Sequence, residues 1–220
     1  MHCDCSATWL FDWLHSHIGL GPVPKCKTPE TLTGISLTSA DLSGVECDPQ
    51  NYRQAMEKCT GPLLCPDHCS CNGQIISCEG SEITQIPTQD LPSDVTELRF
   101  TRARIPEIHD NAFSKFTKLR SLEISDCHVK SISPSAFSNL INLRSLTLFG
   151  NGIEDLPEKV FKDLHNLETL YLNNNALKCL RKGLFSSLTK LRILSLFDNA
   201  LSSIANGTFD SLNNLNILHL

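Results

Sequence analysis

The chain has 220 residues and a formal net charge of −5, a size typical of one or two domains. An acidic balance of this kind does not favour a nucleic-acid-binding protein. No apolar run is long enough to span a membrane as a helix, and residues 1–20 lack the basic flank and apolar stretch of a signal peptide.

Cysteine is unusually common and unevenly placed. The chain has 11 cysteines, of which nine lie within residues 1–78. Cytosolic thiols stay reduced, so this density predicts disulfides and an oxidising compartment. An oxidising compartment without an export signal favours a piece of a longer secreted, extracellular protein.

Two cysteine-rich segments precede the rest of the chain. Residues 1–47 contain Cys3, Cys5, Cys26, Cys47 and the helix-like stretch "WLFDWL". Residues 48–64 connect them to a second group, "CPDHCSCNGQIISC", which starts at Cys65. The second group lacks the paired CxxC spacing of structural zinc sites, so a metal site is not predicted.

The remaining sequence repeats itself every 24 residues. "LRSLTLFGNGI" starts at Leu143, and similar segments start at Val95, Leu119, Leu167, Leu191 and Leu215. Phenylalanines keep the same interval at Phe113, Phe137, Phe161, Phe185 and Phe209. A fixed period of this length predicts a solenoid in which each repeat buries its apolar face against its neighbours.

The pattern within a repeat predicts where its side chains lie. In "LTL" the two leucines of a short strand point inward and the residue between them points outward. Asn151, Asn175 and Asn199 follow these strands. We expect their buried amides to bond the backbone of neighbouring turns. The phenylalanines are expected to fill the convex side.

Residues 95–220 resemble the extracellular leucine-rich repeat, LxxLxLxxNxLxxLpxxaFxxLxx. The resemblance implies an α/β leucine-rich-repeat solenoid, a horseshoe with a parallel concave sheet and disulfide-rich caps. Residues 65–94 resemble the N-terminal cap of this family, which implies Cys65–Cys71 and Cys69–Cys78 bonds. Residues 1–47 resemble the C-terminal cap, here of a preceding solenoid, which implies Cys3–Cys26 and Cys5–Cys47 bonds. Residues 48–64 are then a linker, and repeats are expected before residue 1 and after Leu220.

A C-terminal cap followed directly by an N-terminal cap resembles the Slit family of secreted axon-guidance ligands. "CDCSATWLFDWL", "NYRQAMEKCTGPLLCPDHCSC" and "DVTELRF" carry this resemblance. It implies binding of an immunoglobulin domain of a Roundabout-type receptor through the concave face, with Glu97 and Arg99 on the receptor-contacting strand. The outward strand positions extend this expected partner-binding surface to Glu123, Phe149, Tyr171, Phe197 and His219.

Other chemistry is weaker in the sequence. Asp126, Cys127 and His128 are adjacent, but Cys127 occupies the buried ladder position, so a cysteine nucleophile is not predicted. No cofactor motif is present and no enzyme activity is expected. Two basic groups suggest contact with heparan sulfate: Arg99, Arg102 and Arg104, and Lys178, Arg181 and Lys182. "NGT" at Asn206 is an N-glycosylation sequon.

Other classes of protein share some of these features. A Toll-type receptor ectodomain also contains an internal junction between caps, and other extracellular adhesion proteins carry such repeats. An enzyme with appended repeats, such as peroxidasin, has a single solenoid. Domains outside these residues separate the classes: EGF-like modules for Slit, a membrane span with a signalling domain for Toll, and a haem peroxidase domain for the enzyme.

Overall fold

A computed structural model describes residues 10, 25–26, 30–39 and 65–220. The chain divides into two compact units, Met1–Leu63 and Leu64–Leu220. In the first unit, Lys25 and Ser36 form an antiparallel bridge, and the 3-10 helices η2 (Glu30–Leu32) and η3 (Leu37–Ser39) lie on either side of Ser36. Cys26 and Leu37 are buried. The "WLFDWL" segment lies outside the described residues except for Leu10.

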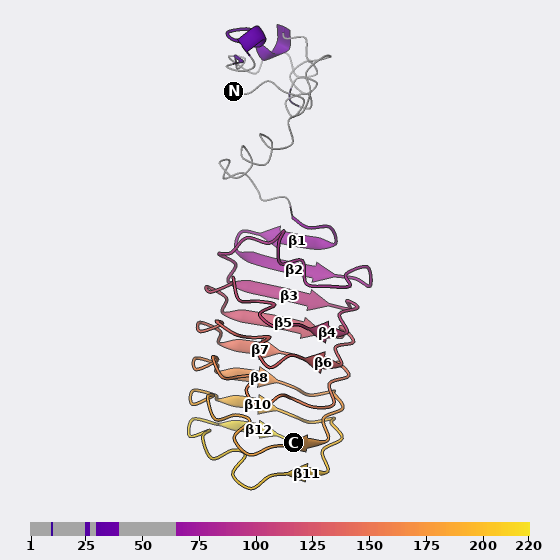
Figure 1. The fold of residues 1–220 in the computed structure, drawn as a ribbon, viewed down its shortest axis with the longest axis vertical. Helices are drawn as coiled ribbons and strands as arrows, with labels where there is room; N and C mark the ends of the chain where they lie inside the picture. Colours follow the sequence, from indigo (N-terminus) through magenta and orange to yellow (C-terminus); the bar gives the residue numbers. More distant parts are fainter. Residues whose placement is uncertain (1–9, 11–24, 27–29, 40–64) are drawn as a thin grey trace. The chain divides into compact units, whose positions relative to one another are not determined.

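The second unit is a stack of 24-residue turns built on one eight-stranded sheet (Figure 1). Its strands pair in the order β1-β2-β3-β5-β7-β8-β10-β12. Their bounds are Cys69–Asn72 (β1), Ile75–Glu79 (β2), Glu97–Thr101 (β3), Ser121–Ser125 (β5), Ser145–Thr147 (β7), Thr169–Tyr171 (β8), Ile193–Ser195 (β10) and Ile217–His219 (β12).

The register of the sheet follows the sequence repeat. β1 is antiparallel to β2, and all later neighbours are parallel. From β3 onwards, each strand residue pairs with the residue 24 positions later, as Leu98 does with Leu122. A constant repeat length therefore places equivalent side chains in straight columns across the sheet.

The core consists of columns of identical or similar side chains. The inward leucines from Leu98 to Leu194 are fully buried. On the other side of each turn, phenylalanine rings stack on one another: Phe113 on Phe137 at 6.0 Å, and Phe185 on Phe209 at 6.1 Å between ring centroids. The strand alternation and the phenylalanine column expected from the sequence are both confirmed, and the predicted solenoid is correct.

The return path of each turn contains almost no regular structure. Two short parallel sheets occur there, one of β4 (Glu107–Ile108) with β6 (Ser131–Ile132) and one of β9 (Cys179–Leu180) with β11 (Ser203–Ile204). Between residues 65 and 220 the chain has no helix, so hydrogen-bonded turns fill the convex side. The α component of the expected fold class is therefore small in this part of the protein.

Candidate functional site

One face of the eight-stranded sheet is covered by outward-pointing side chains; we call it the open face. Its first column runs Glu97, Ser121, Ser145, Thr169, Ile193 and Ile217, and its middle column runs Arg99, Glu123, Thr147, Tyr171, Ser195 and His219. Neighbours within a column are one strand spacing apart, about 4.8 Å. The residues proposed for partner binding therefore lie on a single surface, with Phe149 and Phe197 just beyond the ends of β7 and β10.

At the β3 end of the open face, Arg99 lies between two carboxylates. Its guanidinium pairs with Glu97 on the same strand, and its Nε is 3.8 Å from Glu123 on β5. Glu123 also accepts a hydrogen bond from the Ser125 hydroxyl at 3.0 Å. Two carboxylates against one guanidinium leave this cluster with a net negative charge, so it favours a basic group on a partner.

At the other end, the open face carries aromatic rings. Phe197 is 39% exposed, and its ring meets the His219 ring edge-on, with centroids 6.3 Å apart. Tyr171 and His219 flank Ser195, whose buried hydroxyl has no hydrogen-bond partner among the described residues. Phe149 and Tyr171 are half-buried rather than exposed as expected, so Phe197 has the highest exposed fraction of these three rings.

The two basic groups expected to bind heparan sulfate are largely neutralised. Arg102 pairs with Glu79. Lys178 pairs with Glu154 at 2.5 Å and Arg181 with Asp155 at 2.7 Å. With Arg99 already paired, only Arg104 and Lys182 of the six have no carboxylate partner within the described part of the chain. The positive potential predicted from the sequence is therefore mostly compensated at these two places.

The asparagine ladder is present, and a thiol extends it. Asn151 Nδ2 donates to the carbonyl of Ile124 at 2.8 Å, and Cys127 Sγ donates to the equivalent carbonyl of Phe100 at 3.3 Å. Burial raises the pKa of the Cys127 thiol to about 11. A thiol this hard to ionise is a poor nucleophile at neutral pH, so Cys127 has a structural role, as the sequence predicted.

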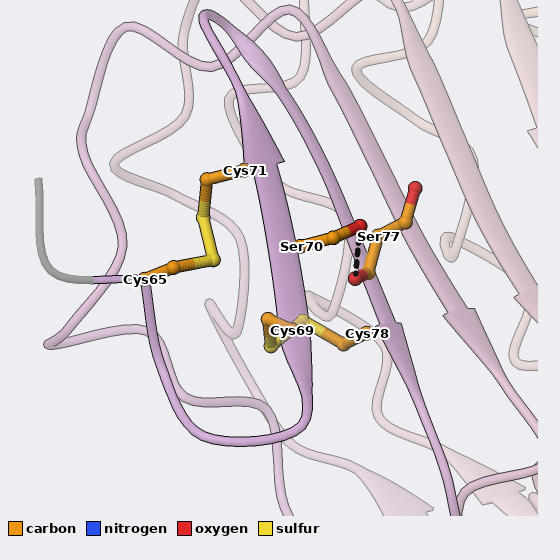
Figure 2. Close-up of a disulfide and its surroundings, with 6 residues drawn as sticks. All are labelled: Cys65, Cys69, Ser70, Cys71, Ser77 and Cys78. Atoms are coloured by element: carbon orange, nitrogen blue, oxygen red, sulfur yellow. Dashed lines mark hydrogen bonds between the residues drawn. A yellow bond between two sulfur atoms is a disulfide. The ribbon is translucent and has the colours of Figure 1, made fainter. Parts of the chain in front are cut away.

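The cysteines of the second unit form two bonds, Cys65–Cys71 and Cys69–Cys78. Figure 2 shows the Cys69–Cys78 bond joining β1 to β2, beside the hydrogen bond from Ser70 to the Ser77 carbonyl. These are the pairs that the resemblance to the N-terminal cap implies. All four sulfurs are bonded to one another, which leaves no thiolate here for zinc.

The other cysteines are only partly described. Cys26 is disulfide-bonded, while Cys3, Cys5, Cys47 and Cys59 lie outside the described residues. Cys127 and Cys179 are free thiols. The two cap-like bonds expected in residues 1–47 therefore stay a prediction.

The glycosylation sequon has an exposed asparagine and a buried threonine. Asn206 is exposed. Thr208 is 3% exposed and donates its hydroxyl to the carbonyl of Ala205 at 2.6 Å. In the repeat, Thr208 occupies the position of Ala112 and Ala136 before the core phenylalanine, so it also has a structural role.

Two repeating features were missed in the sequence. The first is a second amide column, in which Asn142, Asn166 and Asn214 each donate to a carbonyl 25 residues earlier. The second is a left-handed backbone position after each strand, at Arg102, Asp126, Gly150, Asn174 and Asp198, with φ between 52° and 66°. The enrichment of Asn, Asp and Gly at this 24-residue interval was the available signal.

Three observations limit the chemistry of the described residues. No cluster of three or more metal-ligating side chains occurs in them. No helix among them has the length and apolarity needed to cross a bilayer. The open face carries ion pairs and rings, and the hollow lined by Phe197, Leu218, His219 and Leu220 is wide and open rather than enclosed. This arrangement suits binding of another molecule to a broad surface.

Comparison with known proteins gives the same picture. The follicle-stimulating hormone receptors of Ovis aries and Bos taurus are 40% and 42% identical over 57 residues, which span 26% of this chain and 8% of each receptor. The chain thus corresponds to under a tenth of the length of these relatives. A crystal structure of a TLR13–ssRNA13 complex superposes with a TM-score of 0.59 at 29% identity, over 65% of this chain and 20% of that one.

A family model covers most of the second unit. The BspA-type leucine-rich repeat region matches residues 83–220 in six copies. This range contains β3 to β12, the asparagine ladder and the phenylalanine column. Together with the two disulfides, the likeness to receptor ectodomains indicates the extracellular type of repeat domain. The chain belongs to the BspA-type leucine-rich repeat family.

Proposed function

We propose that this chain is part of an extracellular recognition protein, without enzymatic activity, that binds a protein partner on the open face of its sheet. The observation that carries this proposal is the end of the middle column, Tyr171, Ser195 and His219, with Phe197 beside it. These side chains contribute nothing to the leucine core, and rings placed together on a surface are typical of interfaces. A buried hydroxyl without a partner in Ser195 supports the same surface.

The partner we propose is the outermost immunoglobulin domain of a Roundabout-type receptor, which makes the chain part of a secreted Slit-type guidance ligand. The support is the resemblance of residues 1–47 to a C-terminal cap and of residues 65–94 to an N-terminal cap, the order expected where one solenoid ends and the next begins. The pairing of Arg99 with Glu97 and Glu123 adds to it, because charges held in fixed positions orient an approaching partner.

A Toll-type or other receptor ectodomain is the second candidate. It is supported by the likeness to the TLR13 complex and to the follicle-stimulating hormone receptors. In this reading the open face binds a ligand instead of a receptor. The partner of TLR13 in that structure is a single-stranded RNA by name, but the acidic Arg99 cluster and the overall charge of −5 do not favour RNA on this face.

Surface plasmon resonance with an immobilised Roundabout-type immunoglobulin domain tests the proposal. Arg99→Ala and Tyr171→Ala should each weaken binding by about 1–3 kcal/mol, the range of interface hot spots. Lys162→Ala, in an exposed turn away from the sheet, is the control and should have little effect. Loss of binding in the control alone would place the interface elsewhere. No binding by the unaltered chain would favour the receptor reading.

A further inference from the structure

A second surface lies along the edge of the sheet where the parallel strands begin. We call it the strand-entry rim and define it by five exposed basic residues, one exposed isoleucine and one half-buried glutamate: Lys118, Arg120, Arg144, Lys190, Arg192, Ile141 and Glu168. The main-sheet strands β5, β7, β8, β10 and β12 are parallel and point the same way in Figure 1, so the segments that lead into them line up on one side.

The backbone holds the rim side chains at a fixed spacing. Arg144 donates its N–H to the carbonyl of Arg120 at 2.8 Å, Glu168 to that of Arg144 at 2.8 Å, and Arg192 to that of Glu168 at 2.8 Å. Successive rows are about 4.8 Å apart. Arg120, Arg144 and Arg192 therefore lie in one straight column, and Glu168 is the acidic residue in it.

Most of the positive charge on the rim is uncompensated. Arg144 pairs with Glu168 at 3.1 Å. Lys118, Arg120, Lys190 and Arg192 have no ion-pair partner among the described residues. Lys190 donates instead to the neutral Asn166 at 2.7 Å. The rim thus differs from the two basic groups singled out in the sequence, whose charges are mostly neutralised.

A small pocket marks one place on this edge. It has a volume of about 130 Å3 and is lined by Glu168, Lys190, Arg192 and Asn214. The Glu168 carboxylate accepts a hydrogen bond from Arg144. The two cationic side chains that line the pocket, Lys190 and Arg192, therefore have no carboxylate paired with them there. Its size suits a single side chain, and its donors suit a carboxylate.

Ile141 indicates what kind of anion the rim fits. It is 53% exposed and has no part in the core. It lies three residues before Arg144, on the approach to β7. An exposed aliphatic side chain about one turn from Lys118 and two turns from Lys190 offers an apolar contact that a sulfated polysaccharide cannot use. The rim residues include no Phe, Tyr or Trp ring on which a nucleobase could stack.

We propose that the strand-entry rim binds an acidic segment of a protein partner, with a carboxylate at Lys190 and Arg192 and an apolar side chain on Ile141. This interaction is independent of the open face, so the protein can bind two partners or two parts of one partner. Long-range attraction by the arginine column should speed association and make it depend on salt.

Fluorescence anisotropy with the 220-residue chain tests the proposal. The probes are a labelled peptide of alternating Glu and Leu, its Lys–Leu counterpart and a heparin dodecasaccharide, each at 50 and 200 mM KCl. The rim variant is Lys190→Gln with Arg192→Gln. Its matched control is Lys178→Gln with Arg181→Gln, which removes the same charge from bases that already have acidic partners.

We expect the acidic peptide to bind and the basic peptide not to bind. The rim variant should lower affinity at least tenfold and the control less than twofold. Ile141→Ser should lower affinity for the peptide severalfold without changing heparin binding. Equal losses in the rim variant and the control, or no binding of the acidic peptide, would overturn the proposal. Heparin binding that needs Lys190 and Arg192 while the peptide fails to bind would assign the rim to a polysaccharide instead. Intact binding by Tyr171→Ala separates this surface from the open face.

Discussion

Asn175 donates a hydrogen bond from its side-chain amide to the carbonyl of Leu148, one repeat earlier, at 2.8 Å. The same amide donates to Leu172 at 3.0 Å, and its oxygen accepts from the N–H of Ile153 at 3.2 Å. One side chain therefore satisfies backbone groups of two turns that would otherwise be buried without partners. Each buried group left unpaired costs about 1–3 kcal/mol.

Asn175→Ala should consequently lower the free energy of unfolding by about 3 kcal/mol or more. Asn166→Ala is the matched control: its amide donates to only one carbonyl, that of Ile141, at 2.8 Å. We expect a loss of about 1 kcal/mol for this variant. Urea unfolding followed by circular dichroism measures both. Similar losses for the two variants would contradict the role assigned to the buried ladder.

The repeat explains why so much of the fold could be predicted from the sequence. A constant interval of 24 residues sets the register of every parallel pair from β3 onwards, and each buried column has its own residue type. Leu146, Asn151 and Phe161 could be placed because burial and backbone pairing leave few alternatives at their positions.

The binding surfaces were harder to predict because charge depends on neighbours in the next turn. Lys178 and Arg181 looked like a basic patch in the sequence, but Glu154 and Asp155 lie one turn earlier and pair with them. Nothing in the sequence singled out Arg192. The acidic residue one repeat earlier, Glu168, pairs with Arg144, and Arg192 therefore has no ion-pair partner among the described residues. The fold could be predicted from the pattern within a single repeat. The net charge of a surface depends also on the side chains of the adjacent repeats.

Cys127 should make stability depend on alkaline pH. Burial raises the folded-state pKa of its thiol from 9.0 to about 11, so the neutral thiol contributes its full stabilisation below pH 9. That contribution is lost as the pH rises from 9 towards 11, at about 1.4 kcal/mol per pH unit. Urea unfolding at pH 8 and pH 10 should show a larger decrease for the unaltered chain than for Cys127→Ser.

The two free thiols should also differ in reactivity. Cys127 is fully buried, whereas Cys179 is half-buried. At pH 8, N-ethylmaleimide should label Cys179 in the folded chain within minutes and Cys127 only after denaturation. Mass spectrometry of the peptides identifies each site. Rapid labelling of Cys127 under native conditions would show that its burial had been misjudged.

Gly150 should resist substitution because of its backbone and its neighbour. Its φ is +66°, and a Cβ there would lie 2.0 Å from Asp126 Oδ1. Gly150→Ala should destabilise the protein by about 1–2 kcal/mol from the left-handed conformation alone. Gly150→Asn should cost less, since asparagine tolerates this conformation and Asn174 occupies the equivalent position. Adding Asp126→Gly to Gly150→Ala removes the colliding carboxylate, and glycine tolerates the positive φ of 56° at position 126. This second change should recover only the part due to the collision, as measured by urea unfolding.

Substitutions in the sequon at Asn206 should distinguish the role of the glycan from that of a structural hydrogen bond. Asn206 is exposed, so a glycan there is compatible with the fold, but the Thr208 hydroxyl is buried against the Ala205 carbonyl. A glycosylating enzyme that reads the threonine must therefore act before this turn folds.

In protein secreted from animal cells, Asn206→Gln and Thr208→Val should both abolish the mass removed by an N-glycosidase. In unglycosylated chain from bacteria, Asn206→Gln should leave the melting temperature unchanged, whereas Thr208→Val should lose about 1 kcal/mol with its hydrogen bond. If the two variants were equally stable in the bacterial protein, the hydroxyl would have no structural role, and the threonine would serve the sequon alone.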